Sequence, residues 1–353
     1  KIPIHGPTLA AMHHAYGGNA KAMGILAGAI QSEYDNDMES YWQQSGTELL
    51  APTDLKNLVN GQLHRLQDLD PNAYRLFCRL GCYRYQTVPT VPLQGVMALL
   101  WDISTSQQRP ALVALQNRSL IESSKGEYSL HPVLQEAAIA RLKSSPDWQA
   151  SYEAAALFWN QSILSIESDQ NALRALEAYY HYLEIQDYVN AGRVILKSRH
   201  NQWKQYLSLG STLYRMGLVQ PLLSAIPAIT EHLQGDYTLS ELYNILGDVY
   251  WITGQIQNAI QVQEMAIEQS AQALTTLIDG PEFNKSHYYY TMLRVDSRLS
   301  IGLYCLDLWD LEQAADCFEQ VIVQVKGTRH DRWAEKASVC LALTRSYLGQ
   351  TEV

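Results

Sequence analysis

The sequence predicts an all-α protein that ends in a solenoid of helical hairpins, and three observations support this prediction. Most windows of the 353-residue chain place apolar residues at positions i, i+3, i+4 and i+7, which is the spacing of one helix face. Segments with the alternating pattern of a half-buried strand are scarce. From residue 148 onward the helical pattern recurs at a roughly constant interval, as it does in repeat architectures.

The first region, residues 1–85, is predicted to be a helical subdomain. Residues 8–31 fit one or two helices around the turn Gly17-Gly18-Asn19. The next helix begins at Pro52-Thr53-Asp54, where Thr53 or Asp54 supplies the N-cap. A further helix begins at Asp70-Pro71, because proline suits the first position of a helix.

The second region, residues 86–145, has the element order of a winged-helix domain. A helix over 93–101 and a second one from Pro110 precede two strand candidates, 119–123 and 128–131. Lys125-Gly126 forms the tip of the hairpin between the strands, and a helix over 132–143 closes the region. Only Arg109, Arg118 and Lys125 could contact phosphates, so a packing module is favoured over a DNA-binding one.

The third region, residues 148–353, carries the repeats. Its clearest block reads Tyr243-x-x-Leu246-Gly247-x-x-Tyr250, and a similar block begins 37 residues earlier at Tyr206. A later block around Gly302 is offset by 55 residues, which predicts longer helices or an inserted loop before it. These blocks resemble the tetratricopeptide repeat (TPR), in which small residues let two antiparallel helices approach and neighbouring hairpins stack.

Charge and cysteine content narrow the class of protein. The formal net charge is −10, and residues 151–353 hold 14 Lys and Arg against 23 Asp and Glu. Such a surface disfavours nucleic acid and anionic membranes as main partners, and no apolar run is long enough to cross a bilayer. The five cysteines lack CxxC spacing, so we expect reduced thiols in a cytoplasmic protein.

Motifs for catalysis are absent from the sequence. It contains no G-x-x-x-x-G-K-[ST] phosphate-binding loop, no HExxH and no GxSxG. No set of Cys and His has the spacing of metal ligands. We therefore expect no enzyme activity, no metal and no cofactor in this chain by itself.

Two stretches in a particular order suggest a family. The first is Ala15-Tyr16-Gly17-Gly18-Asn19-Ala20-Lys21, and about 110 residues later comes Tyr128-Ser129-Leu130-His131-Pro132. With the winged helix and the repeats, this order resembles the NB-ARC class of STAND signalling ATPases with a tetratricopeptide sensor. The resemblance covers residues 1–143 and continues into the repeats, although Ala20 and Pro132 depart from the family's Pro and Asp.

The resemblance implies nucleotide contacts in a longer protein. It places Gly18 and Asn19 on the adenine side of a bound nucleotide and His131 at the β-phosphate of ADP. The phosphate-binding loop would lie upstream of Lys1, so this chain would be the back part of a larger ATPase that binds ADP or ATP and self-associates on activation. Alternatively, His131 is simply a residue at a strand end that precedes a helix begun by proline.

The repeats predict a binding groove on their concave side. The first helix of each hairpin would line it through residues near positions 2, 5, 9 and 12, which include Tyr214, Glu241, Asn244, Asp248 and Trp251. Asp296, Leu299, Leu303 and Leu306 hold these positions in the next block. Carboxylates beside aromatic rings suit a basic or aromatic peptide. The alternative is that the acids only solvate a helix face and the leucines pack internally.

Three classes of function follow from these features. The first is the regulatory and ligand-sensing part of a signalling ATPase, whose repeats bind a protein or peptide and whose winged helix relays the nucleotide state. The second is a TPR scaffold or adaptor without nucleotide control. The third and least favoured is a winged-helix transcription regulator. The chain is also expected to lack a complete C-terminal capping helix, which would expose apolar surface at that end.

Overall fold

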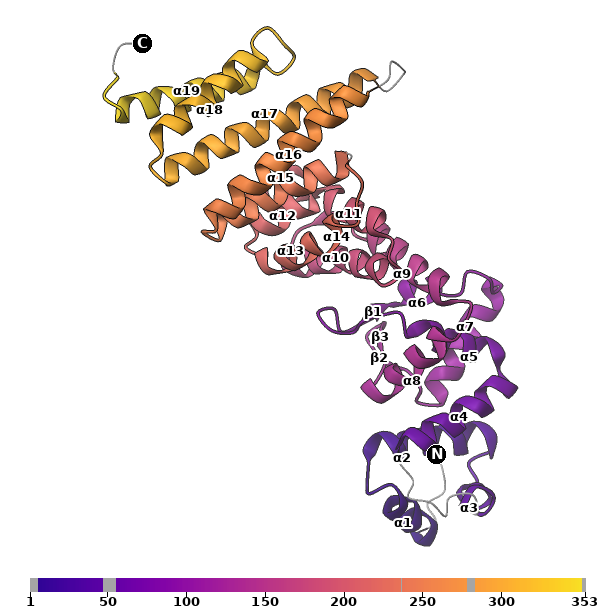
Figure 1. The fold of residues 1–353 in the computed structure, drawn as a ribbon. Helices are drawn as coiled ribbons and strands as arrows, with labels where there is room; N and C mark the ends of the chain where they lie inside the picture. The colour runs from indigo at the N-terminus through magenta and orange to yellow at the C-terminus, as the bar shows by residue number, and fades with distance from the viewer. Residues whose placement is uncertain (1–5, 47–54, 236, 278–282, 351–353) are drawn as a thin grey trace. The chain divides into compact units, whose positions relative to one another are not determined.

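The computed structural model describes residues 6–46, 55–235, 237–277 and 283–350. The chain forms two compact units, of which the first ends at Ser162 and the second begins at Ile163. Helices dominate both units, and each unit also contains one three-stranded sheet of very short strands. The predicted all-α fold class is therefore confirmed (Figure 1).

The first unit holds nine helices and one sheet within its described residues. Its helices are α1 (Gly6–Ala15), α2 (Ala20–Glu33), α3 (Met38–Gly46), α4 (Leu55–Leu69), α5 (Pro71–Leu80), α6 (Leu93–Ala98), α7 (Thr105–Asn117), α8 (Pro132–Lys143) and α9 (Trp148–Ser162). The strands are β1 (Val91–Pro92), β2 (Glu122–Ser124) and β3 (Glu127–Ser129).

The turn and cap residues define the ends of several helices in this unit. Gly17 and Gly18 have φ of +58° and +71°, a conformation that glycine adopts without strain. Asp70 caps α5, which begins at Pro71 as predicted. The predicted cap at Thr53 or Asp54 lies outside the described residues.

The sheet contains the predicted hairpin and one strand that the sequence did not indicate. Strands β2 and β3 pair antiparallel, and both Lys125 and Gly126 at the tip have positive φ, as a tight hairpin turn requires. The additional strand β1 pairs with the other edge of β3, which gives the order β1-β3-β2.

The prediction that the second helix of this region starts at Pro110 is wrong. Helix α7 begins at Thr105, and Pro110 lies inside it. Gln107 and Gln108 donate their backbone N–H groups to the carbonyl of Ser104, so the first turn is already formed ahead of the proline. Pro110 is the sixth residue of α7, so it removes one backbone donor from the helix interior, and the helix nevertheless continues to Asn117.

Helix α9 belongs to the first unit, so that unit extends past the predicted boundary near residue 145. A Cβ on Gly95 of α6 would lie 2.8 Å from the ring of Phe158, which shows how closely α9 approaches α6. The rings of Tyr83 and Trp159 meet edge to face with centroids 6.4 Å apart. The division of this unit at residue 85 stays a prediction.

The second unit consists of successive helices and a small sheet. Its helices are α10 (Asp169–Glu184), α11 (Tyr188–Leu196), α12 (Leu209–Arg215), α13 (Val219–Ala225), α14 (Pro227–Thr230), α15 (Tyr237–Ile252), α16 (Ile256–Thr276), α17 (Phe283–Asp307), α18 (Leu311–Val325) and α19 (Asp331–Tyr347). The strands are β4 (Ser165–Ile166), β5 (Ser198–Asn201) and β6 (Tyr206–Ser208), in the order β4-β5-β6.

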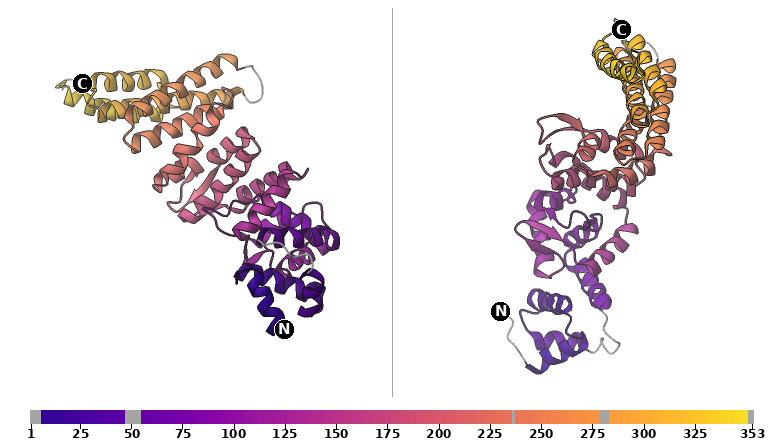
Figure 2. Two further views of the ribbon diagram at one scale, coloured as in Figure 1. Left: turned by 60° about the horizontal axis from the view of Figure 1, so that its bottom comes forward. Right: turned by 90° about the vertical axis from the view of Figure 1, so that its left-hand side faces the viewer.

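Helices α15 to α19 lie side by side as successive hairpins (Figure 2). The large offset before the block around Gly302 reflects long helices, because α16 spans 21 residues and α17 spans 25. The block that begins at Tyr206 was predicted to start with a helix, and this is wrong. Tyr206–Ser208 is strand β6, which pairs with β5, and Ser208 caps the helix that follows it.

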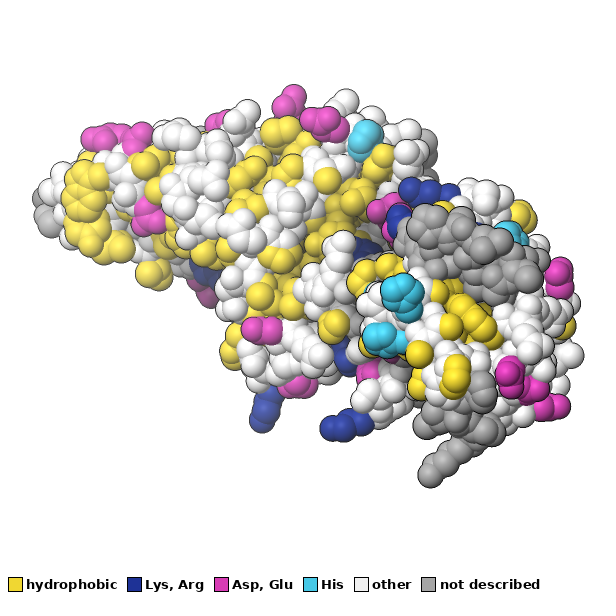
Figure 3. All heavy atoms as spheres, turned by 90° about the horizontal axis from the view of Figure 1, so that it is seen from below, with side chains coloured by type: hydrophobic (Ala, Val, Ile, Leu, Met, Phe, Trp, Pro, Cys, Tyr) yellow, Lys and Arg dark blue, Asp and Glu magenta, His cyan; other side chains and the backbone are white. Residues whose placement is uncertain are grey.

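Apolar side chains remain exposed on the last hairpin. Val323 of α18 and Val339 of α19 are 80% and 72% exposed, and Leu343 is 49% exposed. Figure 3 shows one face of the molecule, on which hydrophobic side chains gather over the helical repeats while carboxylates are scattered along the edges. These exposed apolar side chains lie on the last two described helices.

Two further observations concern the cysteines and the hydropathy of the helices. All five cysteines are free thiols, as the sequence predicted. In the part of the chain that the structure describes, no helix has both the length and the hydropathy needed to cross a membrane.

Gly302 allows the closest contact between α17 and α18. A Cβ at this position would lie 2.6 Å from the ring of Phe318, a fully buried side chain. We expect Gly302→Ala to lower the free energy of unfolding by about 1–2 kcal/mol, because overpacking outweighs the better helix propensity of alanine. Gly61→Ala in α4 is the matched control, since nothing lies within 4 Å of a Cβ there and the change should stabilise slightly. Urea unfolding measures both, and a stabilised Gly302→Ala would contradict the prediction.

Candidate functional site

A row of polar and aromatic side chains on α12, α15 and α17 forms the candidate site. On α15, Glu241, Asn244, Asp248 and Trp251 follow one another at intervals of three and four residues, so they share one face of the helix. We call this row, together with the partners described below, the acidic–aromatic face. All of its residues lie in the second unit.

Asp248 lies at the centre of the acidic–aromatic face. Its carboxylate accepts a hydrogen bond from the Tyr214 hydroxyl of α12 at 3.1 Å and another from the Tyr304 hydroxyl of α17 at 2.9 Å. The two donors approach different carboxylate oxygens. One acid on α15 therefore links the helices on both of its sides.

Asn244 makes a second link between α15 and α17. Its side-chain N–H groups lie 3.3 Å from an oxygen of Asp296 and 3.2 Å from the hydroxyl of Ser297. Gln263 of α16 donates to the backbone carbonyl of Asn244 and to the hydroxyl of Tyr304, both at 3.1 Å. This buried amide network fixes the register of three helices.

Trp251 extends the face toward the end of α17. Its indole N–H donates to Asp307 at 2.6 Å, and its ring meets that of Tyr304 with centroids 5.2 Å apart. An indole and a phenol thus lie next to each other beside Asp248. Trp251 is partly exposed and can contact a ligand, whereas Tyr304 is fully buried beneath it.

The carboxyl groups of the face are held in a partly dehydrated setting. Burial raises the pKa of Glu241 to about 7, against a smaller opposing effect of its hydrogen bond with Tyr237. Burial and the nearby charge of Asp248 raise the pKa of Asp296 to about 6. The pKa of Asp248 is also raised by burial, although its two tyrosine donors oppose the shift. Such acids gain most from a cation that enters the site.

The predicted groove residues are brought together in part. Tyr214 and Asp248 touch directly, and Asn244 and Trp251 lie on the same helix face. Asp296, named in the sequence as the equivalent position of the next block, joins them through Asn244. The sequence analysis missed Tyr304, Gln263 and Asp307.

The leucines proposed for the same groove lie elsewhere. Leu299 is buried in the core cluster formed by α17, α18 and α19, and Leu303 and Leu306 pack against that cluster. The alternative that these residues pack internally is therefore correct.

The residues assigned to nucleotide contact have clear local roles. Asn19 is the N-cap of α2, and its side-chain oxygen accepts from the amides of Lys21 and Ala22 at 3.0 Å. His131 is the N-cap of α8, with its Nδ1 atom 3.4 Å from the amide of Val133. At Gly18 a Cβ would lie 2.7 Å from the ring of His13. No hydrogen bond within the described ranges joins His131 to Gly18 or Asn19.

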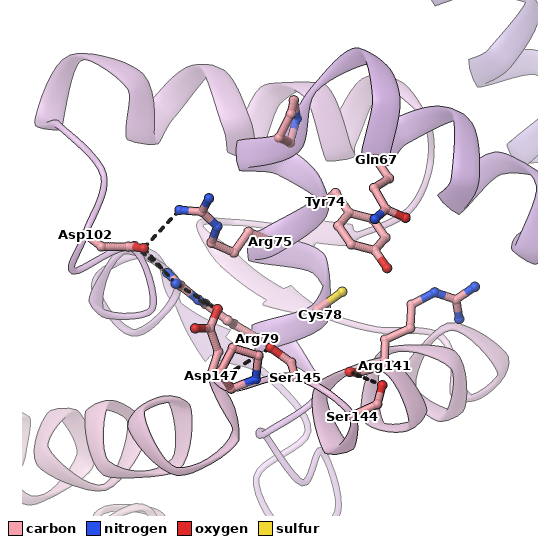
Figure 4. Close-up of a pocket in the computed structure, with 12 residues that line it drawn as sticks. Gln67, Tyr74, Arg75, Cys78, Arg79, Asp102, Arg141, Ser144, Ser145 and Asp147 are labelled. Carbon is pink, nitrogen blue, oxygen red and sulfur yellow. Dashed lines mark hydrogen bonds and ion pairs between the residues drawn. The ribbon is translucent and has the colours of Figure 1, made fainter.

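A polar pocket in the first unit is organised by a buried arginine. The side chain of Arg79 is 1% exposed, and its guanidinium bonds Asp102 at 2.6 Å and Asp147 at 2.9 Å. Arg79 also stacks on the ring of Trp101, at 3.8 Å from the ring centroid. Figure 4 shows Arg75 reaching the same carboxylate of Asp102.

This pocket has a volume of about 710 Å³ and separates two groups of side chains. The arginine–aspartate cluster lies on one side, and Tyr74, Cys78 and Arg141 lie on the other (Figure 4). Hydrogen bonds from Arg79 hold the pKa of Asp102 down to about 2, so its carboxylate stays charged. Because both aspartates compensate Arg79, the cluster is a structural element that joins α5 to the segments around Asp102 and Asp147.

Comparisons with known proteins give partial matches. A search against family models finds no match. A stretch of 121 residues is 30% identical to an uncharacterised WD repeat-containing protein of Nostoc sp., and it covers 34% of this chain and 9% of that protein. Among solved structures, a signal transduction ATPase with numerous domains (STAND) and a tetratricopeptide repeat sensor from Pyrococcus horikoshii has a TM-score of 0.35 and 12% identity. That alignment covers 93% of this chain and 57% of the other, so this chain spans only part of each protein it resembles.

Proposed function

We propose that this chain is the regulatory and ligand-sensing part of a STAND/NB-ARC signal-transduction ATPase. In this proposal the helical repeats bind a protein or peptide, and the region 86–145 relays the nucleotide state. The order of the two sequence stretches around Gly18 and His131, followed by the repeats, supports the family assignment. The acidic–aromatic face supports the binding of a partner.

The single observation that carries the binding proposal is a set of buried carboxylates that form no close ion pair. Glu241, Asp248 and Asp296 form no ion pair with any described Lys or Arg side chain, although burial raises the pKa of all three. An arginine of a partner would supply both a charge and several N–H donors. It would also stack on Trp251, which is partly exposed and lies against Tyr304. The proposed partner is therefore a protein or peptide with a basic side chain at its centre.

The test is the affinity for a protein captured from native lysate by the full chain. We expect the pair Glu241→Gln and Asp248→Asn to weaken binding about tenfold or more and to flatten its salt dependence, because the attraction for the basic side chain is lost. Glu264→Gln with Glu268→Gln is the matched control, since both are exposed carboxylates on α16 outside the face. Equal loss in the two pairs, or no loss in either, would remove the binding proposal.

A nucleotide-sensing role for His131 agrees with its geometry. Its Nδ1 atom faces the amide of Val133, which leaves Nε2 as the nitrogen that could donate to a phosphate. The same cap geometry also favours the second candidate function, a scaffold without nucleotide control, because capping by itself explains both Asn19 and His131. His131→Asn separates the two functions, since asparagine is a good N-cap and carries no imidazole. In the intact protein, partner binding and an oligomeric state that His131→Asn leaves unchanged would favour the scaffold.

A further inference from the structure

A second pocket lies at the start of α19 and has the opposite charge from the acidic–aromatic face. It has a volume of about 270 Å³ and is lined by Tyr288 of α17 and by Arg329, His330, Arg332, Trp333 and Lys336. No carboxylate is among its lining residues. At about 30 Å³ per molecule, the pocket could hold about nine waters, so it is larger than an inorganic anion and small for a drug-sized ligand.

The three cations of this pocket have no acidic partner. Arg329, Arg332 and Lys336 form no ion pair with any carboxylate that the structure describes, although acidic residues outnumber basic ones in this half of the chain. Asp331 accepts a hydrogen bond from the amide of Gly327 at 2.8 Å. The ammonium of Lys336 lies over the ring of Trp333, 4.3 Å from its centroid. None of the three positive charges is therefore paired with a carboxylate at close range, although Lys336 lies near enough to Asp296 for its charge to oppose the rise in the pKa of that acid.

His330 adds a buried polar atom without a partner. The residue is 6% exposed, and its Nδ1 atom is buried and forms no hydrogen bond. Its ring stacks on Tyr288 with centroids 4.5 Å apart, which fixes the orientation of the imidazole. Burial and the neighbouring His287 lower the pKa of His330. A buried nitrogen that lacks a partner costs free energy unless a ligand satisfies it.

The backbone at this place also favours an anion. Helix α19 runs for 17 residues from Asp331, and the side chain of its N-cap residue, His330, makes no capping hydrogen bond. The first amides of a helix lack intrahelical partners, and the helix dipole is positive at this end. The dipole thus has the same sign as the three cations.

We propose that this pocket binds a phosphate monoester carried on a planar ring. The phosphate would lie among Arg329, Arg332 and Lys336, which offer charge-assisted hydrogen bonds. The ring would lie against Trp333, whose side chain lines the same pocket and is partly exposed. Such a group can come from a free small molecule or from a phosphorylated tyrosine side chain.

The test uses the full chain and four probes in saturation-transfer NMR titrations: O-phosphotyrosine, O-phosphoserine, adenosine monophosphate and tyrosine. We expect O-phosphotyrosine to bind most tightly, O-phosphoserine more weakly, and tyrosine not at all. The pair Arg332→Gln and Lys336→Gln should weaken O-phosphotyrosine binding at least about tenfold, because two charged donors are removed. Adenosine monophosphate in the same titration distinguishes a free nucleotide from a phosphorylated side chain as the source.

Two further variants make the test specific. Arg193→Gln removes an equally exposed charge on α11 of the same unit and should leave binding unchanged. Trp333→Leu should weaken O-phosphotyrosine binding and leave O-phosphoserine binding intact. Two results would overturn the proposal. One is equal binding of O-phosphotyrosine by the wild type and by the Arg332→Gln, Lys336→Gln pair. The other is no binding of either phosphate at about 5 mM, a concentration on the order of weak metabolite affinities.

Discussion

The pair Asp102→Asn and Asp147→Asn is expected to lower the free energy of unfolding of the first unit by about 3–5 kcal/mol. Both changes keep the size of the side chain and remove its charge. Arg79, which is 1% exposed, then keeps a buried guanidinium without a compensating carboxylate. A buried charge of this kind is among the most destabilising features in a protein.

The control is Arg79→Met, alone and combined with the two asparagines. Methionine fills the space without a charge, so the triple variant should regain much of the stability that the pair loses. Urea unfolding gives the free energies, and hydrogen exchange of the amides of α5 assigns the change to this unit. A triple variant no more stable than the pair would show that packing, and not the charge on Arg79, holds these segments together.

The local elements of the fold could be predicted because their signals lie next to each other in the sequence. Pro71 and Pro132 mark the starts of α5 and α8, and Lys125-Gly126 marks the hairpin tip. The repeat period placed Tyr214 and Asp248 on one face although they are 34 residues apart. Both residues hold groove positions of their blocks, and such positions of stacked hairpins face the same side, so the repeat period was sufficient there.

The missed elements depend on contacts between distant residues. Strand β1 is two residues long and includes Pro92, so no alternation could reveal it. It exists because Val91 pairs with Tyr128, which lies 37 residues later in the chain. In the same way Tyr206–Ser208 is a strand only because β5 pairs with it.

The residues of the acidic–aromatic face could be predicted only where the repeats follow a regular period. Tyr304 and Gln263 join Asp248 and Asn244 across α16 and α17, whose lengths exceed those of the earlier hairpins. The register across such long helices cannot be read from a fixed period. Arg79 was missed for a related reason, since its partners lie 23 and 68 residues away.

Glu241→Gln is expected to stabilise the second unit by about 2–3 kcal/mol at pH 8 and by less than about 1 kcal/mol at pH 5. Burial raises the pKa of Glu241 from 4.5 to about 7 in the folded state. Between these values the folded protein holds a proton that the unfolded chain has released, so the free energy of unfolding falls as pH rises from about 4.5 to 7. Glutamine resembles the protonated acid at every pH and therefore avoids this loss.

Urea unfolding of the wild type and the variant at pH 5, 6, 7 and 8 checks this expectation, and the difference between the two proteins cancels the titration of all other groups. Glu264→Gln, an exposed acid on α16, should follow the wild type throughout. Asp296→Asn should act in the same direction as Glu241→Gln over a lower pH range, because the pKa of Asp296 is raised to about 6. If the Glu241→Gln curve ran parallel to that of the wild type, the carboxyl group would not be dehydrated in the folded state.

The proton that Glu241 retains in the folded state also links the stability of the second unit to binding of the proposed partner. A basic side chain that binds beside Glu241 requires the charged carboxylate, so below pH 7 binding must release the proton that burial retains. Affinity for a basic partner should then rise about tenfold per pH unit toward pH 7 and level off above it, whereas in Glu241→Gln it should stay flat. Above pH 7 the dehydrated charge of Glu241 lowers the free energy of unfolding, and a bound cation would restore that free energy. A face that destabilises its own fold and becomes favourable only with a cation bound is better explained by binding than by solvation of a helix surface.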